Sequence, residues 1–243
     1  MQSIIVLGAS GGLAEAFLPR AVERWGLVLQ GRRCDVLSER VKALGADRAV
    51  AIEAHGAEPE LPQQLWDAAV KLGQPCGLVC MVGTPGRLSD EAWSPESFAD
   101  LFTVNSAVPL WHVHRWAQRM KAHGYPGNAV VLSTMQAVYP FEGSLPYALS
   151  KSGLELGVQI LAKDYGPHIR VNGVAPGVND AGMALASIQK GKYQPYIDRG
   201  IIPRYGHAED VVEAVMFLLQ PDLYMTGQTL LLDGGLTLRR DIG

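Results

Sequence analysis

Cysteine is scarce in this sequence, and its pattern argues against two kinds of stabilising site. The chain contains three cysteines, Cys34, Cys76 and Cys80, with no CxxC pair and no cluster of cysteine and histidine. An odd number without such spacing argues against a disulfide framework and against a structural zinc site. We therefore expect three reduced thiols in a cytoplasmic protein that binds no metal.

The sequence also has no excess of basic residues and no long apolar run. The chain has 21 Lys and Arg against 24 Asp and Glu, a formal net charge of -3. Nucleic acids and anionic membranes are bound through a basic face, so neither is an expected partner. No apolar run reaches the roughly 18 residues of a membrane span. The opening MQSIIVLGAS has no basic segment before its apolar run, so we expect no signal peptide.

The sequence does have enough apolar material for one large domain. Hydrophobic residues make up 48% of the 243 positions, and charged residues 19%. Short, continuously apolar segments predict buried strands at 4–7, 27–30, 48–52, 77–82, 129–133, 169–174 and 229–233. Helical patterns lie between them near 12–24, 34–44, 61–72, 101–123, 147–165 and 208–220. The alternation predicts a single α/β domain over residues 1–243, with a doubly wound parallel sheet and helices on both faces.

The first predicted strand ends in a glycine-rich turn, LGASGGLAEAF, which precedes a predicted helix. Gly8 and Gly12 bracket a turn in which the backbone can approach a diphosphate closely. The helix that follows supplies free N–H groups and the positive end of its dipole. The pattern therefore predicts a dinucleotide site, although it also suits a plain turn between a strand and a helix.

The end of the second predicted strand indicates which dinucleotide is bound. An acidic residue at this point would bind the ribose 2′-hydroxyl of NAD, but the segment reads Gln30, Gly31, Arg32 and Arg33. Arginine forms charge-assisted hydrogen bonds with a 2′-phosphate. The two arginines favour NADP(H), and the alternative is that they are solvated surface charges.

The segment GSLPYALSKSGLE places Tyr147 four residues before Lys151. Residues at this spacing share one face of a helix. Free tyrosine has a pKa of about 10, and a nearby ammonium lowers that pKa, so that the phenol can exchange a proton near neutral pH. The same spacing is also found on ordinary exposed helix faces, so the pair alone does not define a function.

Taken together and in this order, the motifs resemble the short-chain dehydrogenase/reductase family over nearly the whole chain. VNSAVPLW (104–111) is similar to the segment that carries the family's asparagine, and VVLSTMQA (130–137) to its serine-bearing strand end. IRVNGVAPGV (169–178) resembles its Pro-Gly motif. The resemblance implies a Rossmann fold with strand order 3-2-1-4-5-6-7, hydride transfer with NADP(H), and a homotetramer or dimer.

The resemblance also implies roles for individual residues. Tyr147 would donate a proton to a carbonyl oxygen as hydride arrives, and Lys151 would lower the pKa of the tyrosine and bind the nicotinamide ribose. Asn105 would hold a relay water, and Thr134 would orient the carbonyl, with Ser133 as the alternative hydroxyl. The predicted catalytic residues are Asn105, Thr134, Tyr147 and Lys151. The predicted cofactor-binding residues are Gly8, Ser10, Gly11, Gly12, Leu13, Arg32, Arg33, Gly83, Asn105, Tyr147, Lys151, Pro176, Gly177 and Val178.

The chain departs from the family pattern at several points, which marks it as a divergent member. Leu7 stands where threonine is usual, and Ala14 replaces the third glycine of the loop. Residues 80–83, Cys-Met-Val-Gly, replace an Asn-Asn-Ala-Gly run that braces the centre of the sheet. Ala181 replaces a threonine that helps to hold the nicotinamide carboxamide, so that contact is in doubt.

The implied reaction is reduction of a ketone by an NADP(H)-dependent oxidoreductase, with a 3-oxoacyl thioester or a secondary-metabolite ketone as candidates. The irregular segment 178–205 is predicted to be a substrate lid, and the alternative is a surface excursion. Its apolar and aromatic residues suit a hydrophobic small molecule, although they also suit ordinary packing. A different possibility is a catalytically silent NADP(H)-binding regulatory or structural subunit on the same fold.

Overall fold

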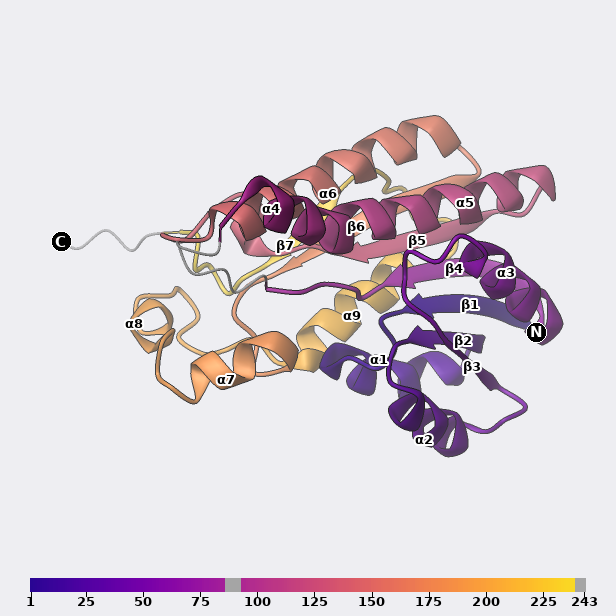
Figure 1. Cartoon of the computed structure of the whole chain (residues 1–243), viewed down its shortest axis with the longest axis horizontal. Coiled ribbons are helices and arrows are strands. Elements are labelled where there is room, and N and C mark those ends of the chain that lie inside the picture. The colour runs from indigo at the N-terminus through magenta and orange to yellow at the C-terminus, as the bar shows by residue number, and fades with distance from the viewer. Residues whose placement is uncertain (86–92, 239–243) are drawn as a thin grey trace.

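A parallel sheet of seven strands forms the middle layer of the protein in a computed structural model, which describes residues 1–85 and 93–238 (Figure 1). The strand order is β3-β2-β1-β4-β5-β6-β7, and every neighbouring pair is parallel. The strands are β1 (Gln2–Leu7), β2 (Gly26–Gly31), β3 (Ala49–Glu53), β4 (Gln74–Cys80), β5 (Gly127–Leu132), β6 (Ile169–Pro176) and β7 (Thr229–Leu232). The predicted fold class and strand order are confirmed.

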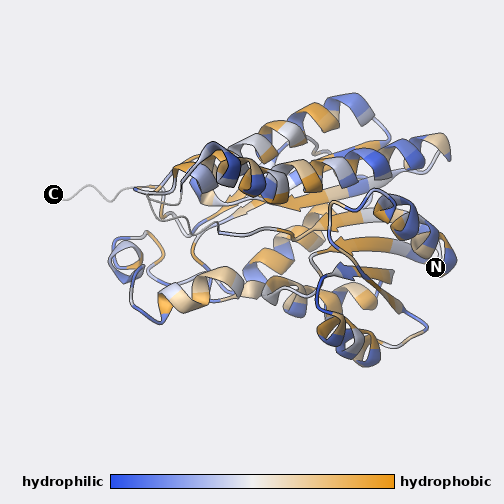
Figure 2. Ribbon diagram, in the orientation of Figure 1, coloured by the Kyte–Doolittle hydropathy of each residue, from blue (hydrophilic) through white to orange (hydrophobic). Residues whose placement is uncertain are grey.

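Helices cover both faces of this sheet, which explains why the strands are apolar throughout. Successive residues of a strand point to opposite faces. In β1, Ile5 and Leu7 pack into a core with α3 (Leu61–Leu72), α5 (Val108–Ala122) and α6 (Leu145–Tyr165). Ile4 and Val6 pack into a second core with α1 (Gly12–Val22), α2 (Cys34–Leu44) and α9 (Ala208–Leu218). Figure 2 shows the strands mainly in the hydrophobic colour between helices of mixed character.

The helix predicted near 101–123 is present, but it starts earlier than expected and contains a π-helical turn. It folds as α4 (Pro95–Phe102), a π-helical turn (Thr103–Ala107) and then α5. Ser94 and Ser97 form a reciprocal cap that starts α4 well before the predicted residue. The wide turn holds Asn105, whose side chain bonds to residues outside the helix. The π-helical turn therefore coincides with tertiary contacts made by a predicted functional residue.

Other boundaries differ from the sequence-based expectations by a few residues. Helix α6 begins at Leu145, two residues before the predicted start, with Pro146 in its first turn, where proline is tolerated. The segment predicted as a lid contains two short helices, α7 (Leu185–Ile188) and α8 (Gln194–Ile197). Within residues 1–85 and 93–238, no helix is both long enough and apolar enough to cross a membrane.

The turn after β1 requires glycine at its first position. Gly8 has a φ of +76°, and a Cβ there would lie 2.9 Å from the carbonyl carbon and oxygen of Met81. We expect Gly8→Ala to lower the free energy of unfolding by about 2–4 kcal/mol, from left-handed strain and this clash. Gly124 has a φ of +68° with no atom within 4 Å of its ideal Cβ. Gly124→Ala should therefore cost only about 1–2 kcal/mol. Denaturant unfolding measures both, and equal losses would contradict the role of the close approach.

Candidate active site

A cavity of about 770 Å³ lies at the carboxyl ends of the central strands. Ligands of doubly wound sheets bind at this edge, beside the point where the strand order reverses. The structure brings ten of the predicted residues into its lining, which includes Gly11, Gly12, Leu13, Gly83, Thr134, Tyr147, Lys151, Pro176, Gly177 and Val178. Among the described residues, Gly8, Ser10, Arg32, Arg33 and Asn105 are predicted site residues that lie outside the lining.

The glycine turn is held in place by arginines as well as by its own backbone. The N–H of Gly11 donates to the Gly8 carbonyl at 2.9 Å. Arg33 donates to the Ser10 carbonyl, and Arg40 donates to the carbonyls of Ala9 and Gly11, the latter at 3.1 Å. Arg40 was not identified from the sequence, because its contact joins α2 to a loop about thirty residues earlier and no local pattern encodes it. Arg33 is thus partly committed to the turn, whereas Arg32 is exposed.

Tyr147 projects into the cavity from the first turn of α6 and pairs with a hydroxyl from the end of β5. Burial raises the pKa of Tyr147, and the hydrogen bond between its hydroxyl and that of Thr134 partly opposes this rise. The phenol is therefore protonated at neutral pH. The net shift of this pKa in the structure is upward, and its lowering by Lys151, which the resemblance implied, stays a prediction.

The neighbouring hydroxyl, Ser133, makes a different contact. Its Oγ donates to Oε1 of Glu155 at 2.7 Å. Thr134 instead bonds to Tyr147, and its Oγ1 also accepts from the N–H of Gln136 at 3.4 Å. Of the two hydroxyls that the sequence left open, Thr134 is therefore the one beside the tyrosine, and its role as the orienting hydroxyl stays a prediction.

Lys151 lies one turn after Tyr147 on the same helix and is 2% exposed. Its Nζ donates to the Leu132 carbonyl at 2.8 Å. Burial lowers the pKa of Lys151 from 10.5 to about 8, while the charges of Cys80 and Glu155 act in the opposite direction. A Cβ on Gly83 would come within 3.4 Å of this Nζ. Glycine at position 83 thus keeps the space beside the ammonium open.

Asn105 braces the segment after β4 against α6. Its Oδ1 accepts from the N–H of Thr84 at 2.8 Å, and its Nδ2 donates to the Thr84 carbonyl and to Oγ of Ser150, each at 3.0 Å. Ser150 in turn donates to the Tyr147 carbonyl at 2.8 Å. Both amide N–H groups of Asn105 are therefore engaged with the protein. This network braces the position where the family's Asn-Asn-Ala-Gly run is missing.

The predicted lid leaves the body and returns to it at one point. Asn179 and Gly206 form a parallel bridge, in which the N–H of Gly206 donates to the Val178 carbonyl at 2.9 Å. Three residues after Asn179, Gly182 packs on the glycine turn, because a Cβ on Gly12 would lie 3.0 Å from its nitrogen. Residues of this segment, among them Ala181 and Tyr196, line the cavity, and the role of the segment as a lid stays a prediction.

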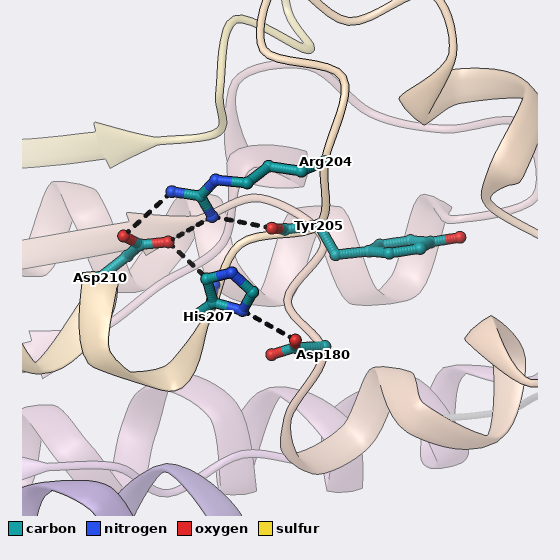
Figure 3. Close-up of polar contacts among 5 residues, drawn as sticks. All are labelled: Asp180, Arg204, Tyr205, His207 and Asp210. Atoms are coloured by element: carbon teal, nitrogen blue, oxygen red, sulfur yellow. Dashed lines mark hydrogen bonds and ion pairs between the residues drawn. The ribbon is translucent and has the colours of Figure 1, made fainter.

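A histidine–carboxylate contact and an arginine–carboxylate ion pair join the base of this segment to the start of α9 (Figure 3). His207 Nδ1 lies 2.8 Å from a carboxylate oxygen of Asp180, and Arg204 donates to Asp210 at 2.8 Å. Asp210 also accepts from the N–H of His207 at 2.8 Å, which caps the helix. The Arg204 hydrogen bond lowers the pKa of Asp210. These contacts hold the start and the end of the segment together beside α9.

Aromatic rings form the outer wall of the cavity. The ring centroid of Phe141, from the loop before α6, lies 5.1 Å from that of Tyr196 and 6.3 Å from that of Tyr193. The ammonium of Lys192 lies 5.8 Å from the Tyr193 centroid. The inner end of the cavity is therefore polar, at Thr134, Tyr147 and Lys151, and its outer end is aromatic.

Comparisons with known proteins agree with this geometry. A family model described as enoyl-(acyl carrier protein) reductase matches residues 14–237. Glucose 1-dehydrogenase of Gluconobacter oxydans is 29% identical, over 99% of this chain and 93% of the relative. The 7alpha-hydroxysteroid dehydrogenase of Bacteroides fragilis is 28% identical, over 97% of this chain and 94% of the relative. A solved structure of an actinorhodin polyketide ketoreductase variant with NADPH has a TM-score of 0.87 at 22% identity and covers 97% of each chain.

The family model spans most of the chain, and the strand order agrees with the fold of the solved relative. The chain belongs to the short-chain dehydrogenase/reductase family, a family of oxidoreductases that act on small molecules.

Proposed function

We propose that this protein is an NADP(H)-dependent reductase of a ketone. The observation that carries the proposal is the hydroxyl pair of Tyr147 and Thr134, which lies in one cavity with the buried Lys151. A protonated phenol beside a second hydroxyl donor is suited to a carbonyl oxygen that gains negative charge. Relatives named as glucose and hydroxysteroid dehydrogenases support chemistry between an alcohol and a carbonyl.

The residues at the inner end of the cavity fit a nicotinamide cofactor. Lys151 has three N–H donors, and among the contacts of the described residues one of them donates to the Leu132 carbonyl. The remaining two are available for the ribose hydroxyls in the space that Gly83 leaves open. Gly11, Gly12 and Leu13 line the same cavity and would meet the diphosphate at the start of α1. When bound, the cofactor supplies the hydride.

The side chains of this chain then handle the substrate oxygen and its proton. Tyr147 donates its proton to the carbonyl oxygen, and Thr134 donates a hydrogen bond that orients the same oxygen. The Lys151 ammonium stabilises the phenolate that remains on Tyr147. In the oxidative direction Tyr147 accepts the proton of the alcohol. Asn105 keeps the tyrosine in place through Ser150, which bonds to the carbonyl of Tyr147.

The substrate that suits the outer end of the cavity is a hydrophobic ketone that carries a ring. Phe141 and Tyr196 offer ring faces or edges to such a molecule. The relative named as a hydroxysteroid dehydrogenase is consistent with this class. A panel of cyclic, aromatic and linear ketones tests the assignment, and a clear preference for linear substrates would contradict it.

The preference for NADPH over NADH tests the cofactor part of the proposal. We expect NADPH to bind about tenfold or more tightly, because Arg32 is exposed at the end of β2 and can pair with the 2′-phosphate. Arg32→Ala should weaken NADPH binding by about tenfold and leave NADH binding unchanged. Arg24→Ala, another exposed arginine, is the matched control.

Fluorescence titration with each dinucleotide gives distinct outcomes. Equal affinity for both would mean that Arg32 is only a surface charge and that the cofactor preference is wrong. Binding of neither dinucleotide would mean that the departures at Leu7, Ala14 and Ala181 have removed the site, and the reductase proposal would fail.

We also propose that the chain forms a homo-oligomer through α6. The exposed side chains Leu145, Leu149, Leu156 and Ile160 lie on this helix, each 48% exposed or more. Such a row of large apolar side chains favours burial against a second copy. Sedimentation analysis should give a mass of two or four chains, and a monomer at micromolar concentration would contradict the proposal.

A further inference from the structure

Helix α6 presents a third polar residue in line with the tyrosine and the lysine. Tyr147, Lys151 and Glu155 follow one another at intervals of four and therefore share a face of the helix. Two consecutive residues at the end of β5 contact Lys151 and Glu155. The Leu132 carbonyl accepts from Lys151 Nζ at 2.8 Å, and Ser133 Oγ donates to Glu155 Oε1 at 2.7 Å. Glu155 itself lies outside the cavity lining among the described residues.

We propose that Glu155 is a positioning residue, which keeps Lys151 in its ammonium form and, together with Ser133, fixes α6 on the end of β5. The consequence for cofactor binding rests on the function proposed above. Glu155 touches neither the cavity nor the reacting groups, so it acts only through Lys151 and Ser133.

The charge balance around Lys151 supports this assignment. Among the described residues, no carboxylate lies within ion-pair distance of its ammonium. The titratable groups that act on the pKa of Lys151 are Cys80 on β4 and Glu155 on α6. Burial raises the pKa of Cys80, so its thiol is neutral at physiological pH. Glu155 is therefore the group whose negative charge can hold a proton on the buried amine.

Two neighbours of Glu155 favour its ionised form. Burial raises the pKa of Glu155, while the hydrogen bond from Ser133 and the positive charge of Lys151 lower it. The arrangement is thus reciprocal, because each of the two charged side chains favours the charged form of the other. Ser133 gives the carboxylate a fixed orientation, which explains why this hydroxyl is turned away from Tyr147.

Removal of the charge with little change of shape tests the proposal directly. In Glu155→Gln, the amide oxygen can still accept from Ser133, so the fold should be retained. The pKa of Lys151 can be followed by NMR of lysine labelled with ¹³C at Cε, with its signal assigned by its loss in Lys151→Met. We expect this pKa to fall by about one unit. Asp164→Asn removes an exposed charge from the same helix and should leave the pKa of Lys151 unchanged.

An unchanged Lys151 pKa in Glu155→Gln would overturn the proposal, and this result does not depend on whether the protein binds a cofactor. NADPH titration then tests the functional consequence. With the pKa of Lys151 moved from about 8 to about 7, affinity should fall about fivefold at pH 8 and by less than about 1.2-fold at pH 6. A loss that is the same at both pH values would contradict a role through the ammonium. Absence of NADPH binding in the wild-type protein would overturn the proposed function, while the NMR titration still decides the role of Glu155.

Discussion

Tyr147→Phe should lower turnover of a ketone by about 10²–10⁴-fold, while the affinity for NADPH changes by less than about threefold. The substitution removes only the hydroxyl that bonds to Thr134 and keeps the ring in its place. The reacting carbonyl oxygen then lacks its proton donor, but Lys151 and the glycine turn still hold the cofactor. Steady-state rates and a fluorescence titration on the same preparation separate the two effects.

Tyr224→Phe is the matched control for this experiment. Tyr224 is fully exposed and lies outside the cavity, so its variant should behave as the wild type. A Tyr147→Phe variant with full turnover would show that another group donates the proton. If the wild-type protein binds NADPH but reduces no ketone in the panel, the alternative of a catalytically silent NADP(H)-binding subunit gains support.

Lys151→Met should weaken cofactor binding, and it should also remove a pH-dependent cost to the stability of the protein. Affinity for NADPH should fall by about tenfold or more, because two charged donors to the ribose are lost. The pKa of Lys151 is 10.5 before folding and about 8 after it, so burial of the charged form costs stability. That cost is fully present below about pH 8 and disappears as the pH rises to about 10.5.

The pH dependence of this variant relative to the wild type is the sharper measurement. The free energy of unfolding of the wild type should gain about 3 kcal/mol relative to Lys151→Met between pH 8 and pH 10.5, at about 1.4 kcal/mol per pKa unit. The lost hydrogen bond to Leu132 shifts the variant by an amount that does not depend on pH. Lys163 lies on the exposed side of the same helix. The free energy of unfolding of Lys163→Met should therefore change with pH as that of the wild type does. If the free energy of unfolding of Lys151→Met also changed with pH as that of the wild type does, burial would not disfavour the ammonium.

Several features of the protein follow from local sequence pattern alone. The apolar segments at 4–7 and 129–133 predicted β1 and β5 to within two residues, because a strand covered on both faces must be apolar at every position. The glycine turn after β1 was also identified from local sequence, since Gly8 adopts a positive φ that other residues avoid. The spacing of Tyr147 and Lys151 was enough to place both side chains on one face of α6.

Other features depend on residues that meet only in the folded chain. The π-helical turn at Asn105 was predicted as regular α-helix, because the partners of Asn105, Thr84 and Ser150, are 21 and 45 residues away. The partners of Ser133 and Thr134 were equally hidden from local pattern, because Ser133 donates to Glu155, which lies 22 residues away. Local pattern carries no information about such pairs.

The sequence by itself thus determined the fold class, the order of its elements and the cofactor-side motifs, since these depend on backbone propensity and on apolar periodicity. The tertiary structure decided the electrostatics of the site. Burial raises the pKa of Tyr147 and lowers that of Lys151, and Arg40 holds the glycine turn from another helix. Desolvation depends on every layer packed around a group, so these properties arise only when the helices have closed over the sheet.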